Sequence, residues 1–147
     1  MSTSADTASG APEAPISAVE QRLAELGLTL PEVVAPVAAY VPAVITGSHV
    51  YTSGQLPFIN GKLEATGKVS TGTEGTSDEP TVSPEDAKAY AAVCAVNALA
   101  AVKSVIGDLD RITRIVKVVG FVSSDPSFTG QPGVINGASE LLGQVFG

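Results

Sequence analysis

The chain has 147 residues, a length that suits one domain with a single hydrophobic core. Its 15 acidic residues outnumber its 8 basic ones and give a net charge of −7. That balance argues against a nucleic-acid binder and against a peripheral membrane protein, because both need a basic face. With one cysteine, Cys94, and one histidine, His49, the chain cannot form an intramolecular disulfide or a metal site of several thiolates or imidazoles, so we expect no metal.

Residues 1–15 are small and polar, without the basic and apolar stretches of a signal peptide, and we expect a flexible tail. The longest apolar runs, 33–45 and 91–102, are shorter than the about 20 residues that span a bilayer. The sequence therefore favours a cytoplasmic protein that spans no membrane.

A short helix is predicted directly after this tail. Ser17 and Glu20 have the Ser-x-x-Glu spacing of a capping box, and Gly27 suits the left-handed position that ends a helix. Three apolar residues share one face of this helix: Val19, Leu23 and Leu26. Residues 16–32 are therefore predicted to form an N-terminal helix and linker ahead of the main domain.

A β-hairpin is predicted near the start of the main domain, which begins at residue 33. Residues 43–46 and 49–53 flank Gly47, and a glycine at the first turn position suits a two-residue type II′ turn. The pair Asn60-Gly61 predicts another tight turn. The next stretch, 67–82, contains almost no residue suited to a core and is predicted to form an exposed loop.

A long helix and two further elements follow. Ser83 as N-cap and Pro84 in the first turn begin a helix that Gly107 is expected to end. Its many alanines permit a close approach to a sheet. The β-branched residues of 112–122 predict a strand with one buried face, and the apolar period over 134–146 predicts a final helix.

The order of these elements predicts an α+β domain in which two helices cover a sheet. Only three or four strands are available, which is few for a sheet with two covering helices. We therefore expect sheet strands to be missing from this stretch of sequence.

Two polar features stand out as candidate binding groups. Ser53, Gly54 and Gln55 end the second hairpin strand, where backbone beside a glycine can approach a ligand closely; the alternative is a bulge or strand exit. Asn136 opens the last helix after a Pro-Gly pair, and the alternative is a cap or a first-turn polar residue.

The two residues with the most reactive side chains are interpreted as structural. His49 flanks the hairpin turn without a carboxylate or cysteine partner, which is typical of a surface residue. Cys94 lies among alanines, where a small buried hydrophobe is the ordinary interpretation. The nearest lysines, Lys88 and Lys103, do not have the helical spacing that would stabilise its thiolate.

Four stretches carry a resemblance to a known family: 39–43 (AYVPA) with Gly47, 50–57 (VYTSGQLP), 115–122 (IVKVVGFV), and Phe128 with 134–136 (VIN). In this order and spacing they resemble the RidA/YjgF family of imine deaminases. The resemblance covers residues 33–147 apart from 67–82, which looks like an insertion. The N-terminal helix resembles that of a longer subgroup of the family.

The resemblance implies a chorismate-mutase-like α+β fold and homotrimers with clefts between subunits. It implies hydrolysis of small 2-imino acids to 2-keto acids and ammonia in those clefts, without a metal or organic cofactor. By position, Tyr40 would line the cleft, Gly54 would offer its backbone to the substrate carboxylate, and Asn136 would add a polar contact. Ser53 and Gln55 would shape the wall.

The family's pattern continues past the last residue of this sequence. An arginine that clamps the substrate carboxylate and a glutamate that positions the attacking water are expected on strands beyond Gly147. The sequence therefore predicts a RidA-like domain over 33–147 that is incomplete at its C-terminus, with no catalytic residue assigned. Two alternatives are open: a non-catalytic trimer that binds a small metabolite and has a regulatory role, and a truncated inactive product.

Overall fold

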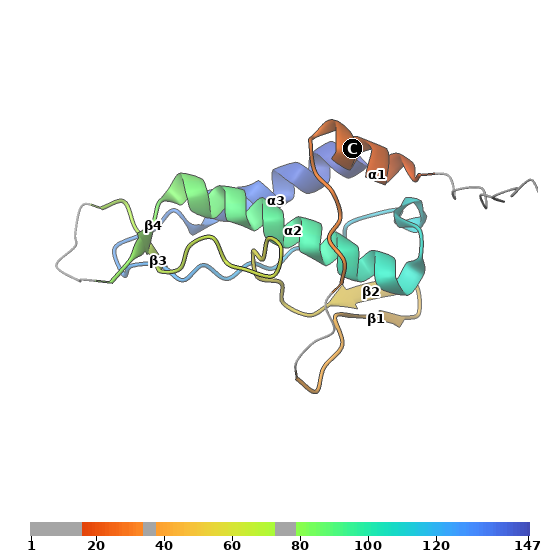
Figure 1. The fold of residues 1–147 in the computed structure, drawn as a ribbon, viewed down its shortest axis with the longest axis horizontal. Helices are drawn as coiled ribbons and strands as arrows, with labels where there is room; N and C mark the ends of the chain where they lie inside the picture. The colour runs from red at the N-terminus through yellow and green to blue at the C-terminus, as the bar shows by residue number, and fades with distance from the viewer. Residues whose placement is uncertain (1–15, 34–37, 73–78) are drawn as a thin grey trace, which may run out of the picture.

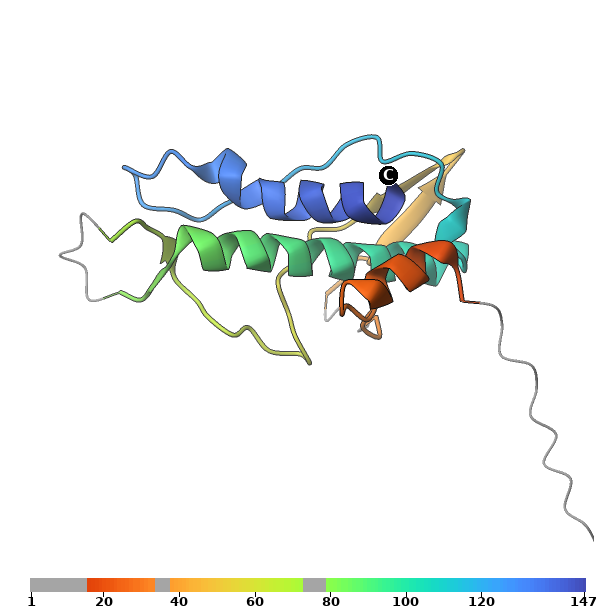
Figure 2. The same cartoon turned by 90° about the horizontal axis from the view of Figure 1, so that it is seen from above.

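The computed structural model describes residues 16–33, 38–72 and 79–147, and the predicted tail lies outside them. Its elements in chain order are α1 (Ala18–Glu25), β1 (Ala43–Thr46), β2 (His49–Thr52), β3 (Lys68–Val69), β4 (Thr81–Val82), α2 (Pro84–Ile106), the 3₁₀-helix η1 (Leu109–Arg111) and α3 (Gln131–Phe146). The long helices α2 and α3 lie side by side, and the β1–β2 hairpin lies along α2 on the side away from α1 (Figure 1, Figure 2). The α+β class is as predicted.

Helix α1 begins and ends as predicted. The Ser17 hydroxyl accepts a hydrogen bond from the Glu20 N–H at 3.1 Å and donates one to the Glu20 carboxylate at 3.2 Å. Gly27 has φ +73°, and its N–H and that of Leu28 bond back to the last turn. Leu26, the C-cap residue, is 43% exposed, so the prediction that it shares the buried apolar face with Val19 and Leu23 was wrong.

Asp110, from η1, supplies further acceptors at the N-terminus of α1. Its two carboxylate oxygens accept hydrogen bonds from the Val19 and Ala18 N–H groups, at 3.0 and 2.8 Å. These two bonds hold the pKa of the Asp110 carboxyl below its usual value. A carboxylate at this end of a helix also interacts favourably with the helix dipole. A tertiary contact therefore extends the cap that Ser17 begins.

We expect Asp110→Asn to lower the thermal midpoint at neutral pH by a few degrees, because an amide offers one acceptor oxygen in place of two and carries no charge. Since the folded pKa of Asp110 is lowered, its contribution is present above the unfolded pKa and is lost as the pH falls through the folded pKa. Thermal unfolding of both proteins between neutral and strongly acidic pH checks this, because the gap should close at the acid end. Glu25→Gln is the matched charge control on α1, and an equal gap at every pH would contradict the assignment.

The β1–β2 hairpin has the predicted strands and turn. Every residue of β1 pairs with one of β2 in an antiparallel register. Gly47 has φ +57° at the first turn position, as a type II′ turn requires. At the second predicted turn, the N–H groups of Ile59 and Lys62 each donate to the other's carbonyl across Asn60-Gly61. Both turn predictions are confirmed.

Helix α2 begins at Pro84 and ends before Gly107 as predicted, and the Ser83 hydroxyl accepts a hydrogen bond from the Asp86 N–H at 3.0 Å. Among the described residues, α2 alone is long and apolar enough to cross a membrane, and 33% of its most apolar window is buried. The core helix of a globular domain has the same length and composition. Because α2 packs against α3 and both hairpin strands, its surroundings are those of a core helix.

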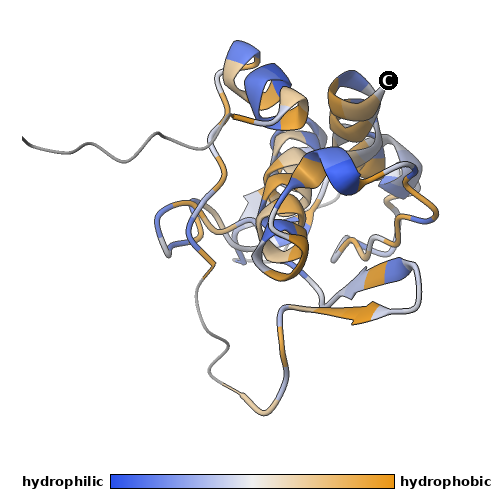
Figure 3. Ribbon diagram, turned by 90° about the vertical axis from the view of Figure 1, so that its right-hand side faces the viewer, coloured by the Kyte–Doolittle hydropathy of each residue, from blue (hydrophilic) through white to orange (hydrophobic). Residues whose placement is uncertain are grey.

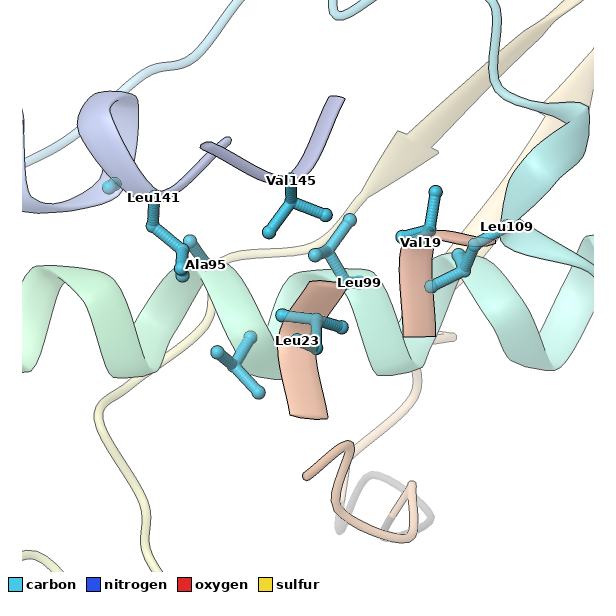
Figure 4. Close-up of a cluster of buried hydrophobic side chains, with 9 residues drawn as sticks. Val19, Leu23, Ala95, Leu99, Leu109, Leu141 and Val145 are labelled. Atoms are coloured by element: carbon cyan, nitrogen blue, oxygen red, sulfur yellow. The ribbon is translucent and has the colours of Figure 1, made fainter. Parts of the chain in front are cut away.

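The main core lies where α1, α2 and α3 meet (Figure 4). Nine buried side chains form it: Val19, Leu23, Ala95, Val96, Leu99, Leu109, Ala138, Leu141 and Val145. Burial of a valine or leucine side chain contributes about 1.5–3 kcal/mol relative to exposure. Helix α1 therefore shares one core with the two long helices.

Helices α2 and α3 make a backbone-level contact at Gly137. A Cβ atom at this position would lie 1.9 Å from the Lys88 carbonyl oxygen, which is closer than real Cβ atoms approach. Beside this point the Lys88 ammonium pairs with the Glu140 carboxylate at 2.8 Å. The alanines of α2 were expected to allow close approach to a sheet, and here α2 also approaches a helix closely.

The ends of the predicted exposed loop belong to a second core. Strands β3 and β4 pair in parallel, and their Val69 and Val82 are buried. These two side chains form a cluster with three others: Ala87, Phe128 and Val134. The loop predicted over 67–82 is therefore wrong at both ends. A strand of two residues shows no period in a sequence, and its burial depends on residues distant in the chain. The middle of the loop, 73–78, lies outside the described residues.

Residues 112–122 run beside the helices without forming a regular strand (Figure 2). The nearest ladder contact is a bridge between Val69 and Ser124, just beyond the segment. Three apolar side chains of the segment are highly exposed: Val116 at 71%, Val119 at 62% and Phe121 at 94%. The strand predicted here is corrected to an unpaired segment, because a strand needs a neighbour to bond its backbone and no described strand lies beside it.

Helix α3 begins at Gln131, three residues earlier than the predicted 134–146. Gly130 occupies the N-cap and Pro132 lies in the first turn, where a missing N–H costs nothing. The apolar period starts only at Val134, so it could not reveal this first turn.

Candidate functional site

The hairpin ends in the 53–55 tripeptide (Ser53, Gly54 and Gln55), which directly follows β2. The Ser53 N–H and hydroxyl both donate to the Pro42 carbonyl, at 2.9 and 3.2 Å. The Gln55 side-chain amide donates to the Ser53 carbonyl at 3.3 Å. These bonds fasten the start of the tripeptide to the residue that precedes β1. Locally, the tripeptide is a strand exit.

Tyr40 lies two residues before Pro42, so the bonds from Ser53 hold its segment near the tripeptide. Its side chain is 54% exposed, and its N–H donates to the Ala38 carbonyl at 2.8 Å in a turn. Tyr40 and the tripeptide therefore both lie near the base of the hairpin.

Gly54 presents open backbone. A Cβ atom at this position would meet no atom within 4 Å, and its φ is outside the left-handed region. Within the described part of the chain, the N–H groups of Gly54 and Gln55 make no hydrogen bond. Nothing in the described structure therefore requires a glycine at position 54, and two neighbouring N–H donors are available to a group from outside.

Asn136 differs from its predicted setting. It lies in the second turn of α3 rather than at its start, because α3 begins at Gln131, and its side chain is exposed. The interpretation as a cap or first-turn residue was therefore wrong. In the described ranges no hydrogen bond joins Asn136 to the tripeptide or to Tyr40. Four of the five candidate residues thus lie around the hairpin, and Asn136 lies on α3 without a hydrogen bond to them in the described structure.

Two cavities of the described structure lie away from the candidate residues. A cavity of about 390 Å³ lies between α1, the 29–33 linker and the C-terminal part of α2. A second cavity, of about 190 Å³, lies beneath α1 and the same linker. Neither is lined by any of the five candidate residues.

Apolar side chains are exposed next to these residues. On the hairpin and the chain that follows it, Val44, Tyr51 and Leu56 are 51–59% exposed, and the apolar colour along the lower hairpin strand is visible in Figure 3. The unpaired segment 112–122 exposes further apolar side chains. Exposed apolar surface is typical of protein interfaces, so these segments are suited to contact another chain.

His49 and Cys94 are not arranged for catalysis in the described structure. His49 begins β2 with its ring exposed, and its ring centroid lies 6.4 Å from that of Tyr51. Cys94 is half-buried on α2, and burial raises the pKa of its thiol, the opposite of what a thiolate nucleophile needs. Among the described residues, no group of three or more His, Cys, Asp or Glu side chains could hold a metal ion.

One residue near the tripeptide was missed by sequence reasoning. The side-chain amide of Asn97, on α2, donates to the Leu56 and Phe58 carbonyls at 2.9 and 3.2 Å. The sequence did contain one indication of this role, because Asn97 is a polar residue that interrupts the apolar run 91–102.

Comparisons with known proteins cover nearly all of the described chain. A family model described as "YjgF/chorismate mutase-like, putative endoribonuclease" matches residues 20–147. "Protein TCP17" of Trypanosoma cruzi is 40% identical over 129 residues, which are 88% of this chain and 75% of that protein.

Two crystal structures are also similar. One, from Shewanella oneidensis MR-1 and described as a "putative endoribonuclease", has a TM-score of 0.76 and 36% identity over 88% of this chain and 80% of that chain. The other, protein Atu1372 of unknown function from Agrobacterium tumefaciens, has a TM-score of 0.74 and 46% identity over 88% of this chain and 74% of that chain.

Proposed function

Because the chain belongs to the YjgF/chorismate-mutase-like family, we propose that it hydrolyses small 2-imino acids to 2-keto acids and ammonia. Water attacks the carbon of the protonated C=N bond, and loss of one proton to the solvent from the added oxygen gives a carbinolamine. A proton then moves from the new hydroxyl to the nitrogen, the C–N bond breaks, and ammonia leaves as the carbonyl forms. The reaction is a hydrolysis in which no atom is oxidised or reduced, so it proceeds without an organic cofactor.

The observation that carries this proposal is the open backbone at Gly54. An imino acid offers a carboxylate, and neighbouring backbone N–H groups are good hydrogen-bond donors to an anion. Gly54 and Gln55 supply such donors with no side chain at position 54 to hold the carboxylate away. Ser53 and Gln55 would form the adjacent wall, and Tyr40 would line the entrance. Groups that protonate the nitrogen or activate water are not assigned.

A second copy of the chain would complete the site. Asn136 is exposed on α3 and makes no hydrogen bond to the other four residues in the described structure, and a cleft between copies is a way to join it to them. The apolar side chains exposed on the hairpin and on segment 112–122 would be buried in the same assembly. We propose a homotrimer, with three times the 14.8 kDa mass of one chain in solution. Its cytoplasmic location stays a prediction from the sequence.

A non-catalytic binding protein is the second candidate. The five candidate residues supply hydrogen-bond donors and a phenol but no carboxylate or imidazole, which a general base for water would normally provide. The same site could therefore hold a small keto or imino acid without turnover and act as a regulatory trimer.

RNA fits this chain less well as a substrate, although its Shewanella relative is described as a "putative endoribonuclease". The net charge of −7 repels a polyanion, since RNA binding requires basic residues that displace counterions from phosphates. Of the chain's eight basic residues, Lys88 and Lys103 are already paired with acidic partners.

An assay in which semicarbazide traps the imino acid tests the proposal. An amino-acid oxidase generates the imino acid, and semicarbazide competes with water for it. A deaminase lowers the yield of trapped product in proportion to its concentration. We expect such a decrease with this chain, and no decrease with a heat-unfolded sample.

Binding of 2-oxobutyrate, a stable 2-keto acid of the product class, separates the two candidate functions. Unchanged trapping together with 2-oxobutyrate binding would contradict the proposed deaminase activity and support the non-catalytic binding protein. Unchanged trapping without any binding would overturn both.

A further inference from the structure

The chain that follows the candidate site is held by a side chain of the central helix. Asn97 lies in the middle of α2, between the alanines of an otherwise apolar run. Its amide nitrogen donates to the Leu56 carbonyl at 2.9 Å and to the Phe58 carbonyl at 3.2 Å. An amide NH₂ group has two hydrogens, which are enough for both bonds.

The two carbonyls converge because of a tight turn about Pro57. The Phe58 N–H donates to the Leu56 carbonyl at 2.8 Å, which closes a three-residue turn. Pro57 suits the centre of such a turn, because its ring fixes φ and it has no N–H to satisfy. Such a turn depends only on neighbouring residues. It therefore determines the local backbone shape but not where the segment lies on the protein. The bonds from Asn97 fasten it to α2.

The tripeptide is therefore fastened at both ends. Ser53 is bonded to Pro42 by its N–H and its hydroxyl. Leu56 is bonded to Asn97, and only Gly54 and Gln55 lie between these two fixed residues. A segment of two residues between fixed ends has few conformations available, although Gly54 itself makes no hydrogen bond in the described structure.

We infer that Asn97 is a positioning residue for the candidate site: by holding the turn at Leu56-Pro57-Phe58 against α2, it fixes the direction of the Gly54 and Gln55 N–H donors. This inference rests on the proposed function insofar as those donors bind a carboxylate. Asn97 itself would not touch the ligand. Its effect passes through the backbone that it holds, so removal of its amide loosens the donors without removing them.

Two variants remove the amide donors in different ways. Asn97→Ala replaces asparagine with the best helix former, so α2 itself is not weakened. Asn97→Asp keeps the shape and replaces the donors with carboxylate oxygens that repel both carbonyls. Asn97→Gln keeps an amide donor and is the rescue variant. The matched control is Lys103→Met, which removes the 2.5 Å bond from α2 to Glu20 and leaves the tripeptide untouched.

The first measurement is the NMR order parameter of the Gly54 and Gln55 amides, which needs no ligand. We expect values near 0.85, typical of rigid backbone, in the natural chain and in Lys103→Met. In Asn97→Ala and Asn97→Asp they should fall below about 0.6, and Asn97→Gln should restore them at least in part. Unchanged order parameters in the two folded variants would overturn the inference.

The second measurement is the Kd for 2-oxobutyrate, followed through the same amide signals. We expect it to rise at least tenfold in Asn97→Ala and to stay within twofold in Lys103→Met, even if both variants lose similar stability. A loss of order at Gly54 without weaker binding would overturn the role of Asn97 in the site. If the natural chain binds no 2-oxobutyrate while Asn97→Ala still loses order, the proposed function fails and the positioning by Asn97 stands.

Discussion

Gly137→Ala is expected to lower the free energy of unfolding by about 1–3 kcal/mol. The added methyl would lie 1.9 Å from the Lys88 carbonyl oxygen, which belongs to the backbone of α2 and cannot rotate away. Helices α2 and α3 would have to separate, and the side chains that both contribute to the main core would lose contact. This loss outweighs the about 1 kcal/mol by which alanine is the better helix former. Urea unfolding with an unchanged m-value measures the difference.

Gly143→Ala is the matched control for this change. It makes the same substitution in the same helix, where a Cβ atom meets nothing within 4 Å. We expect it to leave stability unchanged or to raise it by up to about 1 kcal/mol through helix propensity. Equal effects of the two substitutions would show that the close approach at Gly137 does not hold the helices together.

Gly54→Ala is expected to leave stability nearly unchanged and to reduce kcat/KM for imine hydrolysis about 100-fold. No atom of the described residues lies within 4 Å of the added methyl, and the backbone does not need positive φ, so the fold tolerates alanine. A carboxylate bound at the Gly54 and Gln55 N–H groups would be pushed outward by the methyl. A displacement of about 1 Å from the reactive geometry can cost a factor of about 100 in rate.

The imine-trap assay and urea unfolding on one preparation measure both effects of Gly54→Ala. If the chain binds without turnover, the Kd for 2-oxobutyrate replaces kcat/KM and should rise instead. Gly143→Ala again serves as control, because it adds a methyl to open space far along the chain. Full activity in Gly54→Ala would show that the open backbone at Gly54 does not bind the substrate carboxylate.

The turns and helix ends of this protein could be predicted from its sequence because they depend on neighbours in the chain. Ser17 and Ser83 cap their helices through N–H groups three residues ahead. Gly47 and the Asn60-Gly61 pair adopt the backbone angles that their turns need. In each case the physical cause lies within a few residues.

The strand predicted over 112–122 shows the opposite case. Its β-branched residues fit a strand, but strand formation needs a second backbone to accept and donate hydrogen bonds. No described strand lies beside it, and Phe121 is 94% exposed. Burial of Val69 and Val82 was missed for a related reason, since it depends on Phe128 and Val134 from far along the chain.

For the candidate site, the sequence by itself determined the strand exit at Ser53, the glycine beside it and the family to which these residues belong. Only the tertiary structure decided what holds the site. The Pro42 carbonyl fastens its start and Asn97 fastens its end. The reason is physical: a motif specifies residue types and local turns, whereas a hydrogen bond between residues 41 positions apart exists only after α2 has packed against the hairpin.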